Sequence, residues 1–210
     1  MTTPRGTVMS RWAAFAATPL WAGQAIIWCF APKVQEQVAP FRITRPVLFV
    51  LFWLTIAAAL WFSAAATTAI PHRLALGRGR LVRVGGWLAV TGLTCASLAI
   101  ACILLAPFEK LQQASLTLMT TALFGGTVAL AASLVLSAIA STRLDVATGP
   151  VGKLPAILAA LTVATLLAIA ASGASTIWSL VFAVLIVVLD GIAWATWGHA
   201  SQQPRHELPR

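Results

Sequence analysis

Apolar residues run along the chain in six long stretches that are separated by shorter polar segments. The stretches cover 12–31, 47–70, 86–107, 115–140, 155–172 and 176–197. Each has about the ~20 residues that an α-helix needs to cross the hydrocarbon core of a bilayer. Strands of a membrane barrel would instead alternate apolar and polar side chains. The pattern therefore predicts an all-α, polytopic integral membrane helix bundle with six transmembrane helices.

Prolines mark several ends of these stretches, where helices start or stop. They are Pro32, Pro46, Pro71, Pro107 and Pro155. The first stretch differs from the others because it contains Pro19, Gly23 and Gln24. A kinked or re-entrant segment is the alternative to a full span there. Its length and the lack of a small-residue cleavage site favour a retained span over a cleaved signal peptide.

The composition agrees with a membrane protein. Of the 210 residues, 60% are hydrophobic and 9% are charged, whereas a soluble domain has roughly a quarter charged residues. The chain is too short to add a large soluble domain to six spans, so we expect residues 1–210 to form a single transmembrane domain with a polar tail at 198–210. The three cysteines lie within apolar stretches and lack the spacing of zinc ligands. We expect no metal and no other cofactor.

The basic residues predict the orientation of the chain. The segment 71–83 contains Arg73, Arg78, Arg80 and Arg83, and positively charged loops stay in the cytoplasm. Both termini are then cytoplasmic, and ten of the fourteen Lys and Arg residues lie on that side. The net charge of +9 is thus explained by topology, and nucleic acid is not an expected partner. The predicted location is the cell (inner) membrane.

The same four arginines are candidates for contact with lipid headgroups. A basic residue near an anionic membrane surface gains about 1 kcal/mol. A binding site for phosphate groups is the alternative.

Small residues recur at every fourth position in two of the stretches, which would allow close approach of helices. They are Gly125, Ala129, Ser133 and Ser137, and Ala156, Ala160, Ala164 and Ala168. Because Ala, Gly, Ser and Thr are abundant in this chain, such spacings also arise by chance. They carry no functional prediction.

Asp190 is the one acidic residue within an apolar stretch. A carboxylate at the centre of a membrane helix costs about 2.5–3.5 kcal/mol, so we expect it to face the bundle. At helical spacing it shares a stripe with Trp194 and Trp197. A carboxylate beside indole rings can hold a cation by charge and cation–π attraction, or it can carry a proton. The alternative is a neutral or hydrogen-bonded Asp190 that serves only helix packing.

Gln24 is the second polar residue of interest, because its amide also needs partners in lipid. It is a candidate neighbour of Asp190, and Arg83 or Arg143 could reach inward from the cytoplasmic edge. Further candidate neighbours are Thr91, Thr94, Thr120, Thr121, Thr162 and Thr165.

Motifs of known membrane enzymes are lacking, including paired acids for a diphosphate-bound metal, HExxH and the Walker loop. The leading hypothesis is a small transporter, or a membrane subunit of one, that handles a proton or a cationic or amphipathic small molecule through Asp190, Trp194, Trp197 and Gln24. The alternative is a non-catalytic scaffold with protein partner subunits. A membrane enzyme acting on a lipid or isoprenoid substrate comes third.

Overall fold

The computed structural model describes residues 12–24, 46–73, 79–108, 110–143, 150–171, 188–197 and 199. Within these ranges the chain is helical apart from short turns, and it contains no strand. The labelled helices are α3 (Pro46–Thr67), α4 (Ile70–Arg73), α5 (Arg80–Leu105), α6 (Gln112–Arg143) and α7 (Pro150–Ala171). Two further helical segments cover 12–24 and 188–197.

Three of these helices, α3, α5 and α6, are long and apolar enough to cross a membrane. The described part of α7 contributes a shorter apolar helix, Lys153–Ala164. The predicted class, a helical membrane protein, agrees with these findings. The stretches 12–31 and 176–197 are described only in part, so the count of six spans stays a prediction.

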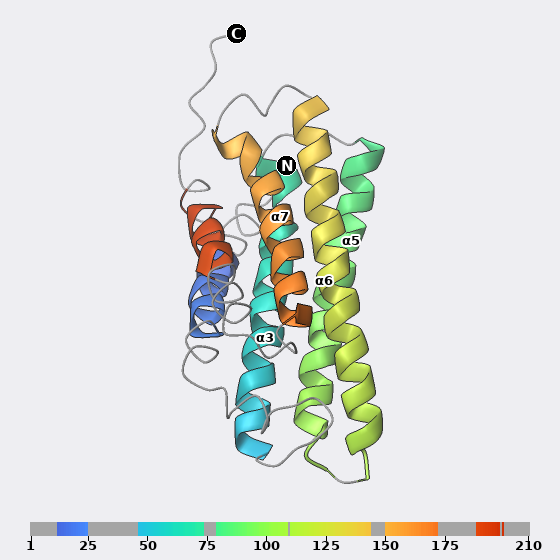
Figure 1. Cartoon of the computed structure of the whole chain (residues 1–210). Coiled ribbons are helices and arrows are strands. Elements are labelled where there is room, and N and C mark those ends of the chain that lie inside the picture. Colours follow the sequence, from blue (N-terminus) through green and yellow to red (C-terminus); the bar gives the residue numbers. More distant parts are fainter. Residues whose placement is uncertain are drawn as a thin grey trace.

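The long helices run side by side as a bundle (Figure 1). Helix α5 packs against both α6 and α3, and α7 packs against α6. The helical segments 12–24 and 188–197 lie together on one side of α3, as the blue and red ribbons show. The core is one continuous cluster of buried apolar side chains that includes residues of these two segments.

The ends of the helices follow the prolines only in part. Pro46 begins α3 and Pro107 follows the end of α5, as predicted. Pro155, however, lies inside α7, which begins at Pro150. Pro150 occupies the first helical position, where the missing N–H is not needed, and it rather than Pro155 marks the start of the helix.

The predicted basic loop 71–83 is also partly helical. Residues 70–73 form α4, and α5 begins at Arg80, so that its first turn contains Arg80 and Arg83. Residues 74–78, including Arg78, lie outside the described residues.

Glycines allow α5 and α6 to approach closely where they meet α3. A Cβ placed on Gly126 would lie 3.0 Å from Cβ of Cys95 and 3.1 Å from Cδ2 of Leu60. A Cβ on Gly92 would lie 3.3 Å from the carbonyl oxygen of Gly126. Further along the same interface, Ser133 Oγ donates a 2.7 Å hydrogen bond to the carbonyl oxygen of Gly85.

The predicted ladders of small residues match these contacts only partly. A Cβ placed on Gly125 would have no atom within 4 Å, so the close contact belongs to its neighbour Gly126. Ala156 and Ala160 are exposed, because α7 turns Leu154, Leu158 and Thr162 toward the core. A four-residue spacing alone therefore did not identify the packed face of α7.

The two adjacent glycines of α6 provide a matched test of this packing. We expect Gly126→Ala to lower the melting temperature of the purified protein, because overpacking typically costs about 1–3 kcal/mol. Gly125→Ala has space for the methyl group and gains helix propensity of up to about 1 kcal/mol, so its melting temperature should be unchanged or higher. Equal melting temperatures for both variants would contradict the close approach at Gly126.

Candidate functional site

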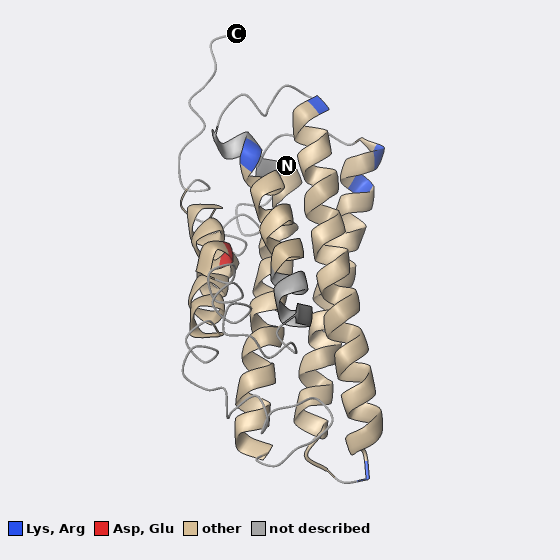
Figure 2. Cartoon of the chain, viewed as in Figure 1, with Lys and Arg blue, Asp and Glu red and all other residues tan. Residues whose placement is uncertain are grey.

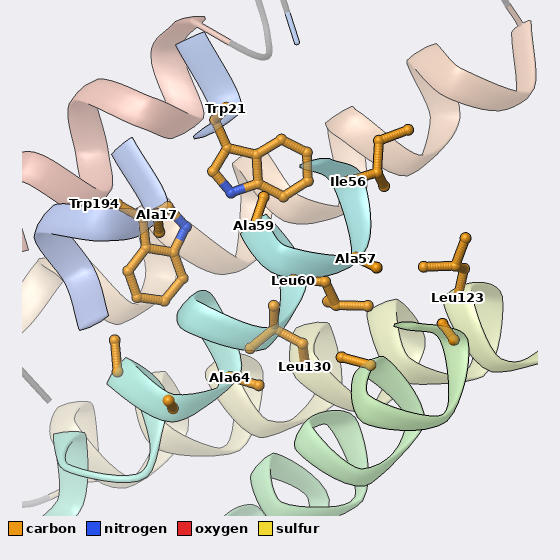
Figure 3. Close-up of a cluster of buried hydrophobic side chains, with 14 of the residues drawn as sticks. Ala17, Trp21, Ile56, Ala57, Ala59, Leu60, Ala64, Leu123, Leu130 and Trp194 are labelled. Carbon is orange, nitrogen blue, oxygen red and sulfur yellow. The ribbon is translucent and has the colours of Figure 1, made fainter. Parts of the chain in front are cut away.

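Buried polar side chains gather where the segments 12–24 and 188–197 meet α3. We call this cluster the polar junction and define it by Trp21, Gln24, Ser63, Asp190 and Trp194, all of which are buried. Figure 3 shows Trp21 and Trp194 pointing toward α3 from the two short segments, with Ala17 and Ala59 close by.

The segment 12–24 is attached to α3 by two side-chain hydrogen bonds. Trp21 Nε1 donates to Ser63 Oγ at 3.2 Å, and Gln24 Nε2 donates to the carbonyl oxygen of Phe52 at 3.0 Å. Thr67 Oγ1 in turn donates to the carbonyl oxygen of Ser63 at 2.8 Å. Gln24 follows Trp21 in the first segment, but its partner Phe52 precedes Ser63 in α3, so the two helices run antiparallel.

The segment 188–197 lies directly against 12–24 at Gly191. A Cβ on Gly191 would lie 3.4 Å from the carbonyl oxygen of Thr18 and 3.7 Å from Cβ of Trp21. A methyl group at this position would be in ordinary van der Waals contact with the first segment, so the two segments lie close together at Gly191. The other face of 188–197 is apolar and exposed at Val188, Leu189 and Ile192.

The stripe predicted for Asp190, Trp194 and Trp197 lies on the buried face of its helix. Asp190 is 1% exposed and Trp194 is 0% exposed. The side chains of Asp190 and Trp194 interact. Even so, Asp190 Oδ1, Trp194 Nε1 and Gln24 Oε1 have no hydrogen bond of acceptable geometry among the described residues.

No cation compensates the carboxyl group of Asp190 within the described part of the chain. Neither the segment 12–24 nor α3 contains a titratable side chain. The basic side chains that the structure describes are all exposed, namely Arg80, Arg83, Lys110, Arg143, Lys153 and His199. An ionised carboxylate that is buried without a partner is costly, and the described residues offer Asp190 no cationic partner.

The threonines that were candidate neighbours of Asp190 use their hydroxyl groups within their own helices. Thr91, Thr94, Thr120, Thr121 and Thr162 each donate to the carbonyl oxygen four residues earlier. The side chain of Thr165 lies outside the described residues. Threonine hydroxyl groups within helices commonly donate to a backbone carbonyl oxygen of the same helix. The spacing of threonines along the sequence does not show whether a hydroxyl group bonds within its own helix or to another helix.

Two tryptophans that lie deep in their apolar stretches are explained by serine partners. Trp21 donates to Ser63, and Trp61 Nε1 donates to Ser97 Oγ at 3.1 Å. The sequence did not predict these hydrogen-bonded pairs. The only indication in the sequence was that both tryptophans lie far from the ends of their apolar stretches, whereas tryptophans at a membrane interface lie near those ends.

The described basic residues gather at one end of the bundle. Figure 2 shows Lys and Arg at the end where α5 and α7 begin and α6 ends, which are Arg80, Arg83, Arg143 and Lys153. Lys110 lies between the end of α5 and the start of α6, and therefore at the opposite end. Of the four arginines predicted to contact lipid, Arg78 lies outside the described residues, and the side chain of Arg73 is not described.

Metal binding has no support in the described residues, because no three His, Cys, Asp or Glu side chains come together there.

Comparisons with protein-family models, with curated proteins and with solved structures found no match to this chain.

The bond between Trp21 and Ser63 can be measured with a double-mutant cycle. We expect Trp21→Phe and Ser63→Ala to be coupled by about 0.5–1.5 kcal/mol in the free energy of unfolding, the usual net contribution of one hydrogen bond. Ser133→Ala removes a hydrogen bond at the interface of α5 and α6 instead. Its coupling to Trp21→Phe should be close to zero, and equal couplings in both cycles would contradict the polar junction.

Proposed function

We propose that this protein is a small transporter, or the membrane subunit of one, and that Asp190 is the group that handles a proton or a cation. The observation that carries the proposal is a buried carboxyl group with an unbonded oxygen and no cationic partner in the described residues. Acidic residues within transmembrane segments are rare and commonly belong to ion pathways or proton relays.

A purely structural role explains this arrangement less well. A polar residue that serves only helix packing is expected to form hydrogen bonds with its polar atoms, as Ser63 and Ser133 do. Asp190 Oδ1 does not, and neither does Gln24 Oε1 or Trp194 Nε1. An apolar residue at position 190 would avoid this cost. A proton or a cation could be the partner of the unbonded oxygens Asp190 Oδ1 and Gln24 Oε1, whereas the N–H of Trp194 can only donate.

We further propose that the protein lies in the cell (inner) membrane, with six spans and both termini in the cytoplasm. Four exposed basic residues at one end of the bundle and one at the other support this orientation. The cytoplasmic end would bring Arg80 and Arg83 to the level of anionic headgroups, with Arg73 and Arg78 in the adjoining segment. Trp197, Trp194 and Gln24 then lie with Asp190 on the path of the transported ion.

The proposal is tested with purified protein in lipid vesicles under an imposed membrane potential. We expect the parent to move protons, read with a trapped pH-sensitive dye, or tetraethylammonium as a probe cation. Asp190→Asn should abolish this movement while its melting temperature stays the same or rises, because the amide removes the cost of a buried charge.

Asp145→Asn is the matched control, since it makes the same chemical change in the segment between two predicted spans. It should retain the activity of the parent. Full activity of Asp190→Asn at equal folded amount would contradict the proposal. Co-purification with a partner and no movement by the parent alone would favour the scaffold hypothesis.

The orientation is tested by cysteine labelling in a variant without Cys29, Cys95 and Cys102. In intact cells we expect Lys110→Cys to react with a membrane-impermeant maleimide, because the end of the bundle with fewer charges faces outward. Arg143→Cys should react only after the cells are permeabilised. The reverse pattern would contradict the proposed topology.

A further inference from the structure

The space around Asp190 bears on which cation the site can accept. Asp190, Trp194 and Trp197 are 1%, 0% and 3% exposed, and Gln24 is buried as well. An organic cation that met the carboxyl group and an indole face together would need both surfaces to be accessible. In the structure, neighbouring side chains already cover them.

The close approach of the two short segments at Gly191 leaves room for about one methyl group between them. One added carbon at Gly191 would already touch the carbonyl oxygen of Thr18 at 3.4 Å. The indole of Trp21 on the same side is held by its bond to Ser63. An organic cation would therefore have to separate the segments 12–24 and 188–197.

A metal ion meets a different obstacle. Hard cations such as Ca²⁺ take about six or more oxygen ligands. The buried side-chain oxygens without a hydrogen bond in the described residues are Asp190 Oδ1 and Gln24 Oε1. Ser63 Oγ already accepts the bond from Trp21. These two side-chain oxygens are fewer than the ligands that such a cation takes.

From this enclosure we infer that the cation handled by Asp190 is a proton, bound to its carboxyl group as the neutral acid. The inference rests on the proposed function and narrows it to one ion. At one face of the membrane an O–H bond of a hydronium ion breaks as the O–H bond of the carboxyl group forms, and at the other face the carboxyl O–H bond breaks as the proton returns to a water molecule. A proton needs neither a cavity nor additional ligands.

The ionised form of Asp190 requires a hydrogen-bond donor, and Trp194 can provide one. Its indole N–H is one turn along the same helix, interacts with Asp190 and has no other acceptor among the described residues. It is thus available as a donor to the carboxylate after the proton has left. The segment 12–24 and α3 contain no titratable group, and His199 at the end of the last segment is exposed.

The first experiment detects the bound proton directly. Infrared spectra of the full-length protein in lipid at neutral pH should contain the carbonyl stretch of a protonated carboxylic acid. The band should be lost in Asp190→Asn, retained in Asp145→Asn, and should decline as the pH is raised. A spectrum in which Asp190→Asn removes no such band would overturn the inference.

The second experiment separates the inference from the proposed function on which it rests. In vesicles with an imposed potential, movement of protons that is lost in Asp190→Asn and kept in Asp145→Asn is expected. Movement of Na⁺ or tetraethylammonium that depends on Asp190 and leaves the internal pH unchanged would overturn the inference while the proposed function stands. Identical movement in parent and Asp190→Asn would overturn both.

Discussion

Hydrocarbon offers no hydrogen bonds, so every polar group that enters it must find a partner within the protein. The backbone meets this requirement by forming helices, and hydroxyl groups such as those of Thr55 and Thr127 donate to the carbonyl oxygen four residues earlier. Lipid tails are also as apolar as leucine, so helices associate through close packing and hydrogen bonds. Several large apolar side chains, such as Trp87 and Phe124, therefore remain exposed on the outside of the bundle, while Gly92 and Gly126 make close contacts inside it.

Asp190 departs from that rule. Many serines and threonines of the described helices have acceptors, whereas the carboxyl group of Asp190, the indole of Trp194 and the amide oxygen of Gln24 retain unbonded atoms in one buried junction. Such an arrangement is costly unless another species occupies it at some stage. A proton satisfies Asp190 without demanding space, which links the packing at Gly191 to the function that we propose.

The fold class and the candidate residue were accessible from the sequence, because both depend on composition and length. Stretches of about 20 apolar residues specify membrane helices, and a lone acid within one of them identifies Asp190 whatever its neighbours are. The helix ends were less accessible, since Pro155 marked an expected boundary and lies inside α7. The first ladder of small residues included the buried Ala129, Ser133 and Ser137 but selected Gly125 rather than Gly126. The second ladder selected Ala156, which is exposed, rather than Leu158.

Only the tertiary structure decided what surrounds Asp190. The sequence offered Gln24 and several threonines as equal candidates, since each could point toward another helix or bond within its own. In the structure the threonine hydroxyl groups of α5 and α6 donate hydrogen bonds to backbone carbonyl oxygens of their own helices. The segments 12–24 and 188–197 come together against α3. A contact such as that between Gly191 and Thr18 depends on how helices rotate and pack, and a residue's own stretch of sequence does not encode that rotation.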